Sequence, residues 1–142
     1  MLGELALQTA VFTTLSNYAP LTALLATYGG SPAIFDAPPQ VDDAGDNTDY
    51  PYLSFGYSVS QPFDGDTFTG SESIVSIHTW GRGQNFAQIK AIMEQVYNAL
   101  HRVDFAISGH AILGCDIDQS ETMRDPDGET VHGVQRFRII FE

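Results

Sequence analysis

Carboxylates crowd the segment from residue 116 to residue 129, which holds six of the eighteen acids in the chain. Oxygen ligands of this kind suit Ca²⁺, and an EF-hand loop arranges them as D-x-[DN]-x-[DN]-G with a glutamate at position 12. The acids at 116–121 lack the glycine of that pattern, and DPDG at 125–128 lacks the distal glutamate. DPDG instead has the Asp, Pro and Gly positions of a type I turn. We therefore expect a turn between two strands here, and no metal site.

A nucleophilic site would need a serine or cysteine beside a histidine and an orienting acid. The four histidines are scattered along the sequence, and no G-x-S-x-G motif occurs. Cys115 lies in a strand-like apolar run, which favours a buried small side chain. GRG at 81–83 precedes a helical pattern but lacks the rest of a phosphate-binding loop, so we interpret it as a strand-to-helix turn. We expect no catalytic residue and no cofactor.

Charge is the compositional outlier, because the formal net charge is −12 and only six side chains are Lys or Arg. None of these six precedes Arg82, whereas nine carboxylates do. Binding to phosphates needs clustered Lys and Arg, so the composition argues against a nucleic-acid-binding protein. The N-terminal segment has no basic n-region and carries Glu4, and a single cysteine cannot form an internal disulfide. We expect a protein made and used without export, with no membrane span.

Length and hydrophobic content predict one folded domain over residues 1–142, of which 43% are hydrophobic. Apolar residues recur every three or four positions over residues 2–18, so we expect a first helix there. A second, short helix should run from Pro20 to Tyr28 and end at Gly29-Gly30. Residues 38–50 are acidic and lack periodicity, which predicts a mobile loop.

Two strand-like runs follow and predict a long antiparallel hairpin. YPYLSFGYSVS at 50–60 alternates apolar and small polar residues, and SESIVSIHTWGR at 71–82 is rich in β-branched and aromatic residues. The residues expected on the buried face of the first run are Leu53, Phe55, Tyr57 and Val59. The tip of the hairpin should carry Asp64 and Asp66, and Trp80, at a strand end, is expected in the core.

The strongest helical pattern is NFAQIKAIMEQVYNALHR at 85–102, where Asn85 and Gln88 have the spacing of a capping box. Two further strands are expected, over residues 110–123 and 131–141. The order helix, helix, strand, strand, helix, strand, strand predicts an α+β domain with an antiparallel or mixed sheet of about four strands packed against helices.

The last strand carries Arg136 and Arg138 on the face opposite its apolar side chains. In so acidic a chain we expect the two arginines to pair with carboxylates, either with Asp116 and Asp118 across the sheet or with acids of a neighbouring subunit. These four residues are therefore candidates for a subunit interface.

Several segments occur in an order that resembles a known family. They are LQTAVFTTLSN near the N-terminus, DAPPQ, YPYLSFG, FTGSESIVSIHTWGR with the following IKAIMEQVYNAL, and the closing RDPDGETVHGVQRFRIIFE. Together they cover nearly the whole chain and are similar to the tail-completion or tail-terminator proteins of long-tailed bacteriophages and gene transfer agents, above all to gene transfer agent tail terminators.

The resemblance implies a structural virion protein without enzymatic activity. It implies a homo-hexameric ring, assembled in the bacterial cytoplasm, that caps the tail tube in the neck region of a virion or phage-like particle and ends polymerisation of the tube. The implied partners are the tail tube protein and a head-completion protein, a stopper or adaptor, below the portal. DNA would pass through the ring without being bound, and no membrane is involved.

The acidic composition fits such a ring, because a lumen lined by carboxylates would repel DNA in transit. The candidate residues for an acidic lumen or for loops that order on assembly are Asp42, Asp43, Asp46, Asp49, Asp64 and Asp66.

Two other classes of function stay open at this point. An acidic DNA-mimic inhibitor would need carboxylates on regular elements at phosphate-like intervals, whereas most of the acids here are expected in turns and loops. A small metal-dependent hydrolase would need a ligand set that the motifs do not supply.

Overall fold

The structure, a computed structural model, describes residues 2–38, 50–83 and 85–142. Its elements are, in chain order, α1 (Glu4–Ser16), α2 (Ala19–Thr22), β1 (Thr27–Tyr28), β2 (Ser31–Pro32), β3 (Ile34–Phe35), β4 (Tyr52–Pro62), β5 (Ser71–Arg82), α3 (Ala87–Leu100), β6 (Ile112–Arg124) and β7 (Thr130–Phe141). The loop expected to be mobile at 38–50 lies, apart from its two end residues, outside the described residues.

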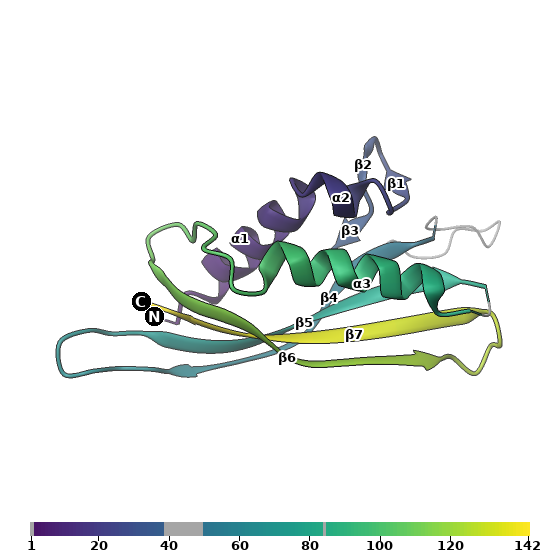
Figure 1. The fold of residues 1–142 in the computed structure, drawn as a ribbon. Coiled ribbons are helices and arrows are strands. Elements are labelled where there is room, and N and C mark those ends of the chain that lie inside the picture. Colours follow the sequence, from purple (N-terminus) through teal and green to yellow (C-terminus); the bar gives the residue numbers. More distant parts are fainter. Residues whose placement is uncertain (1, 39–49, 84) are drawn as a thin grey trace.

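Five strands form a mixed sheet in the order β3-β4-β5-β7-β6. The β3–β4 pair is parallel and the other neighbours are antiparallel. Figure 1 shows the three helices on one side of this sheet, the covered face, while no described helix lies over the other side, the open face. The α+β prediction is confirmed. The sheet has one strand more than expected because β3, only two residues long, is too short to show a periodicity.

The hydrophobic core lies between the covered face and the helices. Along β7, alternation turns Phe137, Ile139 and Phe141 toward α1 and α3, and each is at most 1% exposed. The helices contribute residues spaced three or four positions apart: Leu7, Val11, Leu15, Ile92, Val96 and Leu100. Both long predicted helices are thus confirmed, and the sheet is the partner of α3.

A β-bulge in β4 overturns part of the predicted alternation. Phe55 pairs with Ile77 and Ser58 with Val75, so the two residues between Phe55 and Ser58 oppose one residue of β5. Beyond the bulge the faces exchange, and Tyr57 is 77% exposed instead of buried. The hairpin itself is confirmed, and its distal end extends past the helices in Figure 1.

The expected second helix is wrong beyond its first turn. Only Ala19–Thr22 is helical, and Tyr28 belongs to the short hairpin that β1 forms with β2. Gly29 and Gly30 both have positive φ, 59° and 82°, as a two-residue hairpin turn requires. The two glycines therefore reverse a pair of strands rather than end a helix.

The start of α3 differs from the predicted capping box. Asn85 Oδ1 accepts a hydrogen bond from Ala87 N at 3.2 Å, and the N-cap residue is Phe86.

DPDG is the predicted turn between β6 and β7, closed by a hydrogen bond from Gly128 N to Asp125 O. Within it, the Thr130 hydroxyl and the backbone N–H groups of residues 129 and 130 donate to Asp127, which lowers the pKa of that carboxyl to about 2.

Candidate functional site

The open face carries a lattice of charged side chains on β5, β7 and β6. Arg138 Nη2 lies 3.1 Å from Glu72 Oε2, and this hydrogen bond raises the pKa of the guanidinium. Arg136 Nη1 donates to Gln119 Oε1 at 2.9 Å and lies 3.5 Å from Glu121 Oε1. The two arginines thus pair with carboxylates of their own chain, on strands at either side of β7.

The two aspartates expected to pair with these arginines, Asp116 and Asp118, lie nearby but form no hydrogen bond or ion pair with them among the described residues. Asp116 stands opposite Arg138 in the β6–β7 register, yet its Oδ1 accepts a hydrogen bond from Arg102 Nε at 3.0 Å. Asp118 is an exposed residue at a β-bulge of β6, beside the groove between this strand and α3. The structure therefore brings Arg136, Arg138 and Asp116 together on one face and places Asp118 at the sheet edge.

The tip of the β4–β5 hairpin holds the other described acids of the predicted set. Asp64 Oδ1 accepts a hydrogen bond from Gly70 N at 3.0 Å, which closes the tip, and Asp66 is exposed. The rings of Phe63 and Phe68 pack against each other here, with centroids 6.5 Å apart. The other four predicted acids, Asp42, Asp43, Asp46 and Asp49, lie outside the described residues.

A row of stacked rings crosses the open face, and the sequence analysis missed it. Trp80 stacks on His132 of β7 with centroids 3.8 Å apart, and His132 stacks on His78 at 4.8 Å. Trp80 Nε1 donates to Ser54 Oγ at 3.0 Å, so the tryptophan is half-buried on the open face and not in the core as expected. Only the register of β5 against β7, which pairs residues 80 and 132, could have revealed this row.

The two histidines of this row share one short hydrogen bond, 2.6 Å between His78 Nδ1 and His132 Nε2. Burial lowers the pKa of both rings, and the neighbouring His132 and Arg136 lower that of His78 further. One ring nitrogen must accept in this bond, so a doubly protonated pair would lose it. The His78 ring also lies against Gly56, in the bulge of β4, where a Cβ would overlap the imidazole.

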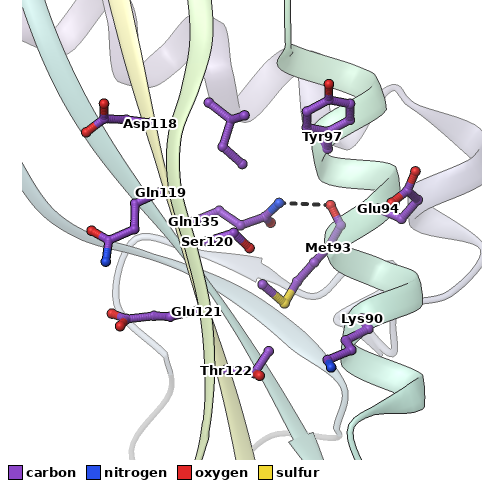
Figure 2. A pocket seen from close by; sticks show the side chains of 11 residues that line it. Lys90, Met93, Glu94, Tyr97, Asp118, Gln119, Ser120, Glu121, Thr122 and Gln135 are labelled. Atoms are coloured by element: carbon purple, nitrogen blue, oxygen red, sulfur yellow. Dashed lines mark hydrogen bonds between the residues drawn. The ribbon is translucent and has the colours of Figure 1, made fainter.

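A groove of about 810 Å³ runs between α3 and the sheet edge at β6 (Figure 2). It is lined by α3 residues including Lys90 and Glu94, by residues 117–122 of β6, and by Gln135 of β7. Gln135 is 2% exposed, and its Nε2 donates to the Met93 carbonyl at 2.9 Å. Its Oε1 has no hydrogen-bond partner among the described residues. A buried amide oxygen left unbonded costs folding free energy.

Metal ligands, the cysteine and long apolar helices were also searched for among the described residues. Within residues 2–38, 50–83 and 85–142, no three His, Cys, Asp or Glu side chains are grouped as a metal would require. Cys115 is buried, as predicted, and burial raises the pKa of its thiol to about 12. None of the described helices is long and apolar enough to cross a membrane.

Comparison with known proteins assigns the chain to a family. Residues 9–142 match the family model of the tail completion protein gp17. The tail completion protein gp17 of Bacillus phage SPP1 is 27% identical over 138 residues, which span 97% of this chain and 93% of the relative.

Two solved structures agree with this assignment. A chain in the virion of a native gene transfer agent particle superposes with a TM-score of 0.78 at 26% identity, covering 96% of this chain and 94% of that one. The structure of bacteriophage SPP1 gp17 superposes with a TM-score of 0.60 at 25% identity, covering 94% and 87%. With the family model matching almost the entire sequence, the chain belongs to the tail completion protein gp17 family.

Proposed function

We propose that this chain is a structural protein of a virion or phage-like particle that closes the tail tube as a homo-hexameric ring. The ring ends polymerisation of the tube protein and joins the tail to a head-completion protein below the portal. The observation that carries the proposal is the superposition, over 96% of the chain, on a chain within a gene transfer agent virion. In this role the chain has no enzymatic activity and resides in the neck region of the particle after assembly in the bacterial cytoplasm.

The exposed surface of α1 supports assembly with neighbouring subunits. Leu5 and Phe12 lie two helical turns apart on one side of α1 and are 79% and 42% exposed, while Leu7, Val11 and Leu15 on the other side are buried. A helix that is apolar on both sides is usually covered on both sides. In a ring, a neighbouring subunit would pack against the exposed side of α1.

The projecting hairpin offers the different, second patch that a ring contact needs. Rotational closure joins two unlike surfaces of identical subunits, one on each side. The hairpin tip presents Phe63 and Phe68, which are 40% and 38% exposed, beyond the end of the helices. Its projecting shape and its aromatic side chains suit a contact with a neighbouring subunit. The charged side chains around Arg136 and Arg138 lie on the open face of the same sheet.

Passage of DNA through the ring is consistent with the charge of the chain. Each copy contributes a net charge of −12, and Asp64 and Asp66 take part in none of the ion pairs among the described residues. Unpaired carboxylates facing a lumen repel the phosphate backbone, so DNA moves through without binding. A potential map of the assembled ring tests this part, and a basic channel wall would contradict it.

A DNA-mimic role is less well supported. Such a protein presents an unbroken negative surface, whereas acids and arginines alternate across the open face in the pairs of Glu72 with Arg138 and of Glu121 with Arg136.

Adding the purified chain to isolated tail tubes of its own particle tests the proposed ring. Electron cryo-microscopy should show six copies in a closed ring at one end of each tube, and further tube protein should no longer extend that end. Binding along the length of the tube, or continued growth from the occupied end, would contradict the proposal.

A further inference from the structure

The outer side of α1 is an apolar surface with a groove beside it. Leu5 is 79% exposed and Phe12 is 42% exposed, and the exposed Thr9 lies on the same side of the helix. The groove, of about 840 Å³, runs between α1 and residues 106–110. Its lining includes the apolar side chains of Leu2, Leu5, Ala6, Ala10 and Ala106. This side of α1 can therefore receive a large apolar side chain.

A second uncovered apolar surface lies on the open face, at the distal half of the β4–β5 hairpin. Beyond the bulge, Val59 pairs with Ile74, and Tyr57 turns outward with 77% of its surface exposed. On the adjacent β7, alternation turns Ile140 to the same face. These four residues form the hairpin patch, and no described helix lies over it (Figure 1).

The charges beside the two surfaces are complementary. Glu4 borders the groove and takes part in none of the ion pairs among the described residues. On the open face, Arg138 stands opposite Ile74 in the β5–β7 register, beside the hairpin patch. Arg138 pairs with Glu72, yet its side chain is 42% exposed. Because a guanidinium has five N–H donors, Arg138 can bind a second carboxylate.

We propose that these two surfaces bind each other between copies of this chain, with the outer side of α1 of one copy packed on the hairpin patch of the next. Tyr57 of one copy enters the groove of its neighbour, and Glu4 of the neighbour pairs with Arg138. A helix packed on a sheet face is the arrangement that each copy already has on its covered face. The inference rests on the proposed function, because this contact, which joins unlike surfaces, closes by rotation into the proposed ring.

The tip of the hairpin and a second α1 fit the groove less well. At the tip, Asp64 and Asp66 lie next to the two phenylalanines in the sequence, and these acids would face Glu4. Packing of two α1 helices against each other would leave Tyr57 and Val59 in water in both copies. The hairpin patch is the occupant that covers both apolar surfaces and brings a base to Glu4.

Disulfide crosslinking of rings on tail tubes tests the proposal. The variant T9C/Y57C has one cysteine at the groove and one in the hairpin patch, while the native Cys115 is buried. The two positions lie on opposite sides of the sheet, so the expected disulfides join different chains (Figure 1). Mild oxidation should give a ladder of up to six linked copies on a non-reducing gel. Either single variant, or T9C/S31C with its second cysteine at an exposed residue of β2, should give no ladder.

Charge reversal in the T9C/Y57C background tests the ionic part of the contact. E4R should lower the yield of linked copies by at least about tenfold, because two arginines would then face each other. Addition of R138E to E4R should recover most of the yield. The control D36R reverses an exposed acid outside both surfaces and should leave the yield unchanged. With equal melting temperatures of E4R and D36R, an undiminished yield in E4R or no recovery in E4R/R138E would contradict the pairing.

Hydroxyl-radical footprinting of the unmodified chain gives a second measurement that needs no substitution. Leu5, Phe12 and Tyr57 should be protected in the ring relative to the free chain, with Tyr28, which is 48% exposed and outside both surfaces, as the reference.

Electron microscopy of the same tubes separates failure of this contact from failure of the proposed function. Rings in which Tyr57 stays unprotected, or in which T9C/Y57C gives no ladder, refute the contact alone. Linked copies that stop at dimers also refute it. Tubes without rings refute the proposed function and the contact together.

Discussion

The two faces of the sheet differ in the interactions that stabilise them. On the covered face, β7 buries Phe137, Ile139 and Phe141 against the helices, while on the open face the same strand carries Arg136 and Arg138 in partly exposed ion pairs. Apolar burial contributes most of the folding free energy, and exposed ion pairs contribute little. Most of the folding free energy therefore comes from the covered face. Side chains on the open face can change with less loss of stability, so they can serve contacts with other proteins.

Substitution of Phe137 should give the largest loss of stability. Phe137→Ala removes a fully buried ring and leaves a cavity, which costs about 3–5 kcal/mol of unfolding free energy. The neighbouring substitution Arg136→Ala removes only a partly exposed ion pair and should cost about 1 kcal/mol or less. Denaturation in urea measures both, and equal losses would break the comparison of the two faces.

Acidification should destabilise the open face through the histidine pair. The pKa values of His78 and His132 are lowered in the folded chain, so folding favours the neutral rings. Their contribution to the free energy of unfolding is complete above the ordinary pKa of 6.5 and is lost as the pH falls through the lowered pKa values of the folded chain. The charged groups that act on the pair are Arg136, Asp125 and Glu121.

Urea denaturation between pH 7.5 and pH 5 checks this, with His78→Gln as the comparison. The wild type should lose more unfolding free energy over this range than the variant. Trp80, the only tryptophan and stacked on His132, should report the same titration by fluorescence. An identical pH dependence in both proteins would show that the pair is not responsible.

Reversal of an open-face charge should affect assembly more than folding. Arg138→Glu places two carboxylates beside each other at Glu72, on a side chain that is 42% exposed, so the melting temperature should fall only slightly. Ring formation on tail tubes, measured by native mass spectrometry and electron microscopy, should weaken clearly. An unchanged hexamer with normal tail attachment would count against an interface role for this residue.

Substitution of Gln135 should have the smallest effect on stability. Gln135→Leu loses the hydrogen bond to the Met93 carbonyl but also removes the unbonded Oε1, so the unfolding free energy should change by no more than about 1 kcal/mol. Urea denaturation measures this change. A large loss of stability would mean that the hydrogen bond to the Met93 carbonyl stabilises the fold by more than the unbonded Oε1 destabilises it.

Local patterns predicted the parts of the fold that depend on neighbours in sequence. The helical stripes of α1 and α3, the β4–β5 hairpin and the DPDG turn are all present. The bulge after Phe55 could not be predicted, because it depends on which residues of β5 stand opposite, and the bulge decides which face Tyr57 occupies.

The candidate site was predicted less completely for the same reason. Spacing identified Arg136 and Arg138 as outward-facing, but their partners Glu72 and Glu121 are chosen by strand order and side-chain reach. The row of Trp80, His132 and His78 and the unbonded Gln135 depend on register and on α3 packing, which no local pattern contains.

Deletion of the gene, followed by electron microscopy of the particles, tests the central claim most directly. A ring that ends the tube and joins it to the head predicts tails of uncontrolled length or tails without heads, restored to normal by the wild-type chain. Particles of normal tail length with heads attached, formed in the absence of the chain, would contradict the claim.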